Sequence, residues 1–304
     1  MSSSQTNKST DLGERPKERI HLEGVEETLF CTLLPKARDA ASPNPILGDP
    51  YAQKLVDSCD VDFSRSTFSA VDNERAMRWV ANRAKTFDRW CQEFLDKHQG
   101  APVTVLHLAC GLDSRVYRVK RRGADVRWID LDRPLVVDLR RRLIPQDPPG
   151  DYSLRTLDVN KSGWLSDIPA DRPTLIMAEG LFMYLTPAKV ESVIRDLVDY
   201  FKQGELVLDT VSKIYVRYTS QVELLQASGA KWLWGTDDAK EVEKFHRQLR
   251  MIDQVWSTEY MGHKSLGRSL VPLFGEGTIG SIKMALASFS PSTYAFGQNV
   301  RFAF

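Results

Sequence analysis

The feature that most constrains this chain is a regular alternation of short apolar runs and helix-forming segments between residues 103 and 211. Each apolar run has the length of a strand, and residues 174–178 (TLIMA) are almost uniformly apolar, as a strand covered on both faces is. Strands that alternate with helices pair in parallel and carry helices on both faces of the sheet. We therefore predict a doubly wound α/β fold, with strands over residues 103–109, 125–129, 152–157, 174–178 and 205–211.

The helices expected around these strands have apolar stripes and recognisable ends. Residues 72–97 place apolar side chains at three- and four-residue steps. Residues 186–202 begin with Thr186 as the N-cap and Pro187 as the first helical residue, and they end before Gly204. Shorter helices are predicted over residues 115–122 and 134–144.

We expect a single domain after a short tail. Residues 1–19 are rich in Ser, Thr, Lys, Arg and Glu, which predicts a disordered tail. Residues 20–304 would form one domain with a helical N-terminal part and a cap over the ligand edge of the sheet. The last residues, 299–304, alternate like an edge strand. The expected parts are residues 20–100 (helical), 101–211 (core), 212–280 (cap, mostly helical) and 281–304 (C-terminal strand region).

Composition argues against several classes of function. The formal net charge is +1, so no overall field attracts nucleic acid or an anionic membrane. No apolar run reaches the roughly 18 residues of a membrane span, and the N-terminal segment has no apolar signal core. The 4 cysteines are not spaced as zinc ligands or as a redox pair. We expect a cytoplasmic protein without a metal, a nucleic-acid partner or a membrane partner.

Polar residues follow the predicted strands at the points where a ligand would bind, because open α/β sheets bind ligands beyond the carboxyl ends of their strands. Gly111 follows the first strand, Asp130 and Asp132 the second, Asp158 the third and Glu179 the fourth. A carboxylate after the second strand can accept hydrogen bonds from both ribose hydroxyls, and one after the third from an adenine amino group. Each residue alone also has a structural interpretation: a strand–helix turn, a helix N-cap or a turn cap.

Two observations narrow the ligand class. Gly111 is all that remains of a Gly-x-Gly-x-x-Gly pattern, which disfavours a pyrophosphate-binding oxidoreductase. Glu179 ends an apolar strand, where an unpaired carboxylate would be costly to bury. We therefore expect a cationic group of the ligand beside Glu179.

Taken together, these pieces resemble the leucine carboxyl methyltransferase family, which includes the tetracenomycin-type polyketide carboxyl O-methyltransferases. The resemblance runs from about residue 25 to residue 256. The run from Gly111 to Arg115 and the stretch around Glu179 are specific in combination. The matching stretches are residues 36–38 (KAR), 49–52 (DPYA), 82–85 (NRAK), 108–115 (LACGLDSR), 130–134 (DLDRP), 157–159 (LDV), 178–185 (AEGLFMYL) and 234–238 (WGTDD).

The resemblance implies a class I methyltransferase core, a Rossmann-like, mostly parallel sheet of seven strands that binds S-adenosylmethionine. It also assigns a part of the cofactor to each matching residue. Those assignments are Arg83 to the methionine carboxylate, Glu179 to its ammonium, Gly111 to the rest of the methionine, Asp132 to the ribose with Asp130 assisting, Asp158 with Val159 to the adenine, and Lys36 beside the cofactor. Tyr184 is the candidate catalytic residue, as a group that positions the acceptor. One departure is Ala109, where the family usually has a glycine.

The acceptor is expected to be an oxygen of a small molecule. A carboxylate is ionised at neutral pH and needs no general base, whereas a phenol, with a pKa of about 10, would need one. No histidine directly follows a predicted core strand, which favours a carboxylate. The sequence of residues 180–184 (GLFMY) is closer to that of the small-molecule branch of the family. The alternatives are a protein C-terminal leucine as acceptor, or a protein that binds the cofactor and catalyses a rearrangement without methylation.

Overall fold

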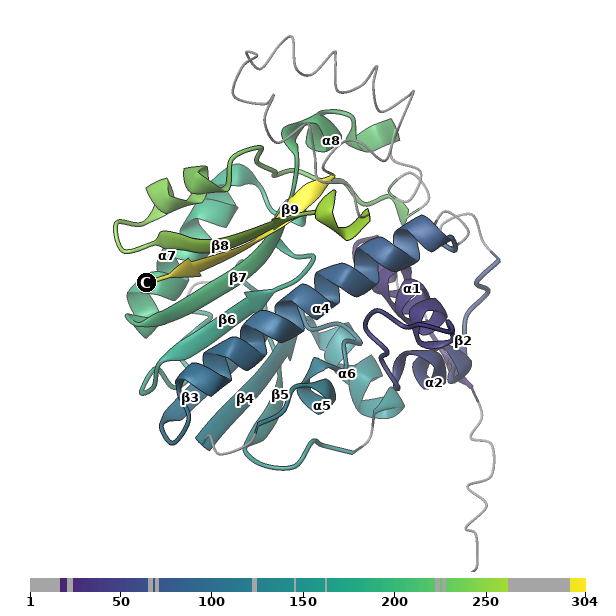
Figure 1. Ribbon diagram of the computed structural model, residues 1–304, viewed down its shortest axis with the longest axis horizontal. Coiled ribbons are helices and arrows are strands. Elements are labelled where there is room, and N and C mark those ends of the chain that lie inside the picture. The colour runs from purple at the N-terminus through teal and green to yellow at the C-terminus, as the bar shows by residue number, and fades with distance from the viewer. Residues whose placement is uncertain are drawn as a thin grey trace, which may run out of the picture.

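The computed structural model describes residues 17–20, 24–64, 68, 71–121, 125–144, 146–161, 163–221, 225, 228–261 and 296–304. Within them a seven-stranded sheet has the order β5-β4-β3-β6-β7-β9-β8 (Figure 1). Its strands are β3 (Pro102–Leu108), β4 (Asp125–Asp132), β5 (Tyr152–Thr156), β6 (Thr174–Ala178), β7 (Gly204–Val211), β8 (Arg250–Trp256) and β9 (Gly297–Ala303).

The five predicted strands are confirmed as β3 to β7, and all of them run parallel. Strand β9 is antiparallel to both of its neighbours, β7 and β8, so the sheet is mostly parallel, as predicted. From β3 the chain first builds β4 and β5 on one side and then crosses to build β6 and β7 on the other. The point of reversal, between β3 and β6, is where a fold of this kind binds its ligand.

Two long helices cover opposite faces of the sheet. Alternate residues of a strand face opposite sides, so Val103 and Val105 pack under α4 (Glu74–Lys97), whereas Leu106 and Leu108 pack under α7 (Pro187–Phe201). Burying each such aliphatic side chain stabilises the fold by about 1.5–3 kcal/mol. The Asn73 side chain caps α4 by accepting from the backbone N–H of Ala76, and α7 has the expected cap at Thr186.

Shorter helices complete the sheet's surroundings. The 3₁₀ helix η1 (Glu26–Leu29) leads into α1 (Phe30–Ala40), which packs against α2 (Ala52–Asp57) and α4. In Figure 1, α1 and α2 lie together beyond one end of the sheet. The remaining helices of the described residues are α5 (Arg115–Arg118), α6 (Pro134–Leu143), α8 (Lys213–Arg217), η2 (Phe182–Tyr184), η3 (Thr219–Gln221), η4 (Ala239–Phe245) and η5 (Glu259–Met261). None of the described helices combines the length and apolar composition of a membrane span.

The C-terminal strand corrects two predictions. Strand β9 lies between β7 and β8 and is not at the edge of the sheet. Its alternating polar residues suggested solvent, but Asn299 and Arg301 are buried, and Arg301 pairs with Glu205 at 2.6 Å. The edge strand is β8, which falls in the segment predicted to be mostly helical; its sequence, RMIDQVW, has neither a long apolar run nor clean alternation.

At the N-terminus, β1 (Glu18–Arg19) pairs in parallel with β2 (Cys59–Asp60), so ordered structure begins within the last residues of the predicted tail. The predicted helix over residues 115–122 is shorter, since α5 ends at Arg118. Residues 1–16 of the predicted tail and residues 262–295, which include parts of the predicted cap and C-terminal region, lie outside the described residues.

Candidate active site

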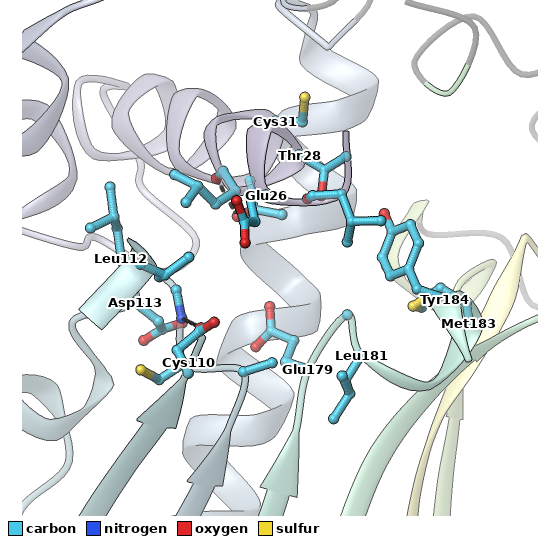
Figure 2. A pocket seen from close by; sticks show the side chains of 18 of the residues that line it. Glu26, Thr28, Cys31, Cys110, Leu112, Asp113, Glu179, Leu181, Met183 and Tyr184 are labelled. Atoms are coloured by element: carbon cyan, nitrogen blue, oxygen red, sulfur yellow. Dashed lines mark hydrogen bonds between the residues drawn. The ribbon is translucent and has the colours of Figure 1, made fainter. Parts of the chain in front are cut away.

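A cavity of about 500 Å³ lies beyond the carboxyl ends of the parallel strands. Its volume suits a single small ligand, for which pockets of about 300–1,000 Å³ are usual. Figure 2 shows the Glu179 carboxylate pointing into it from the end of β6, with Asp113 on one side and Tyr184 on the other. The cavity is lined by all but one of the predicted site residues: Lys36, Arg83, Gly111, Asp132, Asp158, Val159, Glu179 and Tyr184.

The exception is Asp130, which is not among the lining residues. Its side chain is fully buried and accepts hydrogen bonds from Trp128 Nε1 at 2.7 Å, from Arg140 Nη2 at 2.9 Å and from the Tyr152 hydroxyl at 3.0 Å. His107 Nδ1 lies 3.3 Å from Asp130 Oδ1. With its acceptor sites used in this way, Asp130 anchors α6 and β5 to the sheet and has no free face for a ribose.

Asp132 ends β4 and lines the cavity. Its carboxylate accepts from the backbone N–H groups of Gly111 and Arg133, both at 2.7 Å. The N-cap residue of α6 is Arg133, and no side chain caps that helix, so Asp132 does not have the capping role considered for it. Burial raises the pKa of Asp132, and the two backbone N–H groups oppose that rise. The charged carboxylate is thus held at some cost beside a cavity, as is common for residues that bind ligands.

The side chain of Glu179 is buried, as expected, but it is paired within the protein, so its charge is balanced without a ligand cation. Arg83 Nε donates to Glu179 Oε1 at 3.1 Å, and Arg115 Nη2 donates to Oε2 at 2.6 Å. Burial by itself would raise the pKa of Glu179, but the positive charges of Lys36, Arg83 and Arg115 outweigh it and lower the pKa. These partners come from α1, α4 and α5, elements far apart in the sequence, so their proximity could not be predicted from the residues beside Glu179.

Asp209 is a residue of this cluster that the sequence analysis missed. It lies within β7, is 3% exposed and accepts from Arg83 Nη1 at 2.9 Å and from the Gly180 backbone N–H at 2.7 Å. Burial raises its pKa, and Arg83 opposes that rise. The signal that could have found it is the one used for Glu179, since an acid interrupts the strand ELVLDTV.

Lys36 extends from α1 to the turn after β3. Its Nζ donates to Asp113 Oδ2 at 2.6 Å, and both side chains are less than a tenth exposed. Burial would raise the pKa of Asp113, but Arg115, Lys36 and Arg118 together hold it well below its ordinary value. Lys36 therefore joins η1 and α1 to the cavity floor through a buried ion pair.

The turn after β3 has two residues in the left-handed region, Ala109 with φ 51° and Gly111 with φ 53°. Gly111 adopts this conformation without a steric penalty, and its N–H reaches Asp132. Ala109 stands where the family usually has glycine and costs about 1–2 kcal/mol in that conformation. The departure noted in the sequence is thus a strained backbone position in the cavity wall, because Ala109 also lines the cavity.

Asp158 makes the turn that was considered for it and also lines the cavity. Its carboxylate accepts from the Asn160 backbone N–H at 3.0 Å, which makes a turn after β5, and the same residue lines the cavity. The neighbouring Val159 is 8% exposed and supplies an apolar wall. The turn therefore orients the carboxylate at the cavity wall.

The other end of the cavity is aromatic. Tyr184 lies there with Trp79, Trp232 and Phe296. The ring of Phe296 packs edge-on against Trp79 and Trp232, with centroids 5.0 Å and 5.3 Å apart. The indole N–H of Trp232 is buried beside the Tyr184 hydroxyl. Burial raises the pKa of the Tyr184 hydroxyl, which stays protonated at neutral pH as a potential donor.

No histidine of the described residues is free to act as a base in the cavity. His107 lines it, but its Nε2 lies 3.1 Å from Arg115 and its Nδ1 faces Asp130. His246 pairs with Asp199 away from the lining residues, and His263 lies outside the described residues. Nor do the described residues contain a group of three or more side chains suited to holding a metal ion.

Glu179 should make protein stability depend on pH in the acidic range. Because its pKa is lowered on folding, its stabilising effect is fully present above the ordinary value of 4.5 and is lost as the pH falls through the lowered value. In urea unfolding, the wild type should be more stable than Glu179→Gln at neutral pH, and this difference should shrink below pH 4.5. A difference that stayed constant down to about pH 3 would contradict the assigned charge state.

Comparisons with known proteins identify the family of this chain. The family model described as leucine carboxyl methyltransferase matches residues 31–198. The tetracenomycin polyketide synthesis O-methyltransferase TcmP of Streptomyces glaucescens is 39% identical over 240 residues, covering 79% of this chain and 85% of that protein. The S-adenosyl-L-methionine-dependent methyltransferase dpfgK of Gibberella zeae is 38% identical over 241 residues, covering 75% and 80%.

Solved structures show more distant similarity. A duf574 family protein from Streptomyces avermitilis has a TM-score of 0.49 and 15% identity, covering 88% of this chain and 96% of that one. Magnesium protoporphyrin IX methyltransferase from Synechocystis, with bound SAH, has a TM-score of 0.47 and 10% identity, covering 79% and 95%.

Proposed function

The chain belongs to the leucine carboxyl methyltransferase family and is an S-adenosylmethionine-dependent O-methyltransferase, and we propose that its acceptor is a carboxylate or phenol oxygen of a small, polyketide-type molecule. The observation that carries the proposal is the sharing of one cavity by acidic and basic side chains from the ends of separate strands and helices. They are matched in chemistry to the separate parts of the cofactor.

The residues that line the cavity offer a partner for each part of S-adenosylmethionine. Arg83 would bind the methionine carboxylate and Glu179 the ammonium, with Gly111 and Lys36 beside them. Asp132 would accept from the ribose hydroxyls, since each oxygen of a carboxylate can accept more than one hydrogen bond. Asp158 would accept from the adenine amino group while Val159 packs on the ring. All of these residues line the cavity, which supports the assignment.

The bound cofactor supplies an activated methyl group on a sulfonium, so the protein has mainly to position the acceptor and exclude water. The aromatic end of the cavity suits a flat, largely apolar acceptor. The Tyr184 hydroxyl and the neighbouring Trp232 Nε1–H are two donors that could orient its oxygens. Since no free base lines the cavity among the described residues, a carboxylate, which needs none, is the favoured acceptor.

The test is methyl transfer from radiolabelled S-adenosylmethionine to a set of acceptors. Aromatic polyketide acids, their phenolic analogues that lack the carboxyl group, and a peptide ending in leucine would be compared. We expect label in the polyketide acids, released by mild alkali because the product is a methyl ester. Label stable to alkali would indicate a phenol ether, label in the peptide would favour the protein C-terminal alternative, and cofactor binding without any transfer would favour a rearrangement.

A further inference from the structure

We infer that Asp209 is a positioning residue, which holds Arg83 and the Gly180 turn in the arrangement that receives the amino-acid end of the cofactor. The inference rests on the proposed function. Asp209 itself is not among the residues that line the cavity, so it would act through its two partners.

The Arg83 guanidinium contacts two carboxylates and one aromatic ring. Nη1 donates to Asp209 at 2.9 Å, while Nε and Nη2 both lie 3.1 Å from Glu179 Oε1. The Trp79 ring lies 4.5 Å from the guanidinium carbon. Because arginine has five N–H donors in a rigid fork, the N–H groups that Asp209 does not use can donate to a ligand carboxylate while Nη1 stays on Asp209. Asp209 would thus keep the arginine in place when its other partner changes.

Gly180, which follows Glu179 directly, is the second partner of Asp209. Its N–H donates to the other oxygen of Asp209 at 2.7 Å, and its φ of 73° lies in the left-handed region that favours glycine. One carboxylate therefore fixes both the arginine for the ligand carboxylate and the turn that carries the acid for the ligand ammonium. The two partners donate to different oxygens of Asp209, so an asparagine keeps the shape but turns an NH2 donor toward one of them.

The test separates the amino-acid end of the cofactor from its nucleoside. S-adenosylhomocysteine carries both, whereas 5′-methylthioadenosine lacks the amino-acid end. By isothermal titration, Asp209→Asn should weaken S-adenosylhomocysteine binding at least about tenfold, since hydrogen bonds to charged groups contribute about 1.5–3 kcal/mol. Its affinity for 5′-methylthioadenosine should stay within about twofold of wild type. Equal losses for both ligands, or no loss for either, would overturn the inference.

Glu205→Gln is the matched control. Glu205 lies on the same strand and the same face, is 3% exposed and accepts from Arg301 Nε at 2.6 Å, but it is at the opposite end of β7. Glu205→Gln therefore removes a similar buried charge, but at a residue that does not line the cavity. Both affinities should remain those of the wild type; a selective loss of S-adenosylhomocysteine binding in Glu205→Gln would count against a specific role for Asp209.

A double variant keeps the inference testable if Asp209→Asn folds poorly. Arg83→Gln with Asp209→Asn removes both charges of the pair, which avoids leaving one buried alone. Compared with Arg83→Gln alone, any further loss in the double variant should come only from the Gly180 turn, so it should affect S-adenosylhomocysteine and not 5′-methylthioadenosine; a further loss shared by both ligands would contradict the inference. Failure of the wild type to bind S-adenosylhomocysteine at all would instead overturn the proposed function.

Discussion

Replacing Glu179 with glutamine should weaken S-adenosylhomocysteine binding by about 100-fold and leave 5′-methylthioadenosine binding nearly unchanged. The loss corresponds to about 2.7 kcal/mol, within the range for removing one partner of a buried, hydrogen-bonded charge pair. The amino-acid end of the ligand would lose the acceptor for its ammonium. In addition, Arg83 and Arg115 would lose the carboxylate that both now contact.

The selectivity between the two ligands is the informative part of this experiment. A general disruption of the cavity would weaken both ligands equally. The control is Glu191→Gln, an exposed acid of α7 paired with Arg195 at 2.6 Å, which should change neither affinity. Titration calorimetry at neutral pH gives the affinities, and unchanged S-adenosylhomocysteine binding in Glu179→Gln would refute the ammonium assignment.

The second large effect is expected at the two acids after β4, which the sequence could not separate. Asp132→Asn should weaken S-adenosylhomocysteine and 5′-methylthioadenosine alike, by about 10- to 100-fold, because both ligands carry the ribose. Its effect on the stability of the ligand-free protein should be small, because removing the buried charge offsets the one backbone hydrogen bond that asparagine no longer accepts. The pKa of Asp132 is raised by burial, so the folded protein binds a proton there more tightly than the unfolded chain, and the charged form costs stability above the raised pKa. A neutral side chain removes that cost.

Asp130→Asn should have the opposite phenotype and is the natural control. Burial would raise the pKa of Asp130, but Arg140 and His107 outweigh it, so its pKa is lowered and its charge stabilises the folded protein above the ordinary value of 3.8. Losing that charge should cost about 3 kcal/mol in urea unfolding. The folded fraction should bind both ligands as the wild type does. A loss of affinity in Asp130→Asn equal to that in Asp132→Asn would show that the two acids share the ribose.

The positions of residues at strand ends predicted that Gly111, Asp132, Asp158 and Glu179 would share one cavity, because this follows from topology alone, whereas Lys36 and Arg83 were placed only by the family resemblance. Parallel strands bring their carboxyl ends to one edge, so residues such as Asp132 and Asp158 could be grouped without knowing any contact. What sequence position could not show is the partner of each charge. Glu179 looked unpaired because its arginines come from α4 and α5, and Asp130 looked equivalent to Asp132 because Arg140 approaches it from α6.

The fold, like the site, was predicted where it depends on local patterns and missed where it depends on distant partners. Uniformly apolar strands such as β6 were predicted with their observed bounds, since burial on both faces leaves a clear pattern. Strand β8 was missed and β9 was misplaced at the edge because their polar residues suggested solvent. Burial of Asn299 and Arg301 depends on partners from distant elements, including Tyr260 and Glu205. Long-range pairing of polar groups is therefore the information that local patterns lack.

The most direct test of the central claim is a crystal structure of the protein with S-adenosylhomocysteine. We expect the ligand in the cavity beyond β3, β4 and β6, with its carboxylate on Arg83, its ammonium on Glu179, its ribose hydroxyls on Asp132 and its adenine beside Asp158. Density for the ligand in the reverse orientation, or anywhere outside this cavity, would contradict the account.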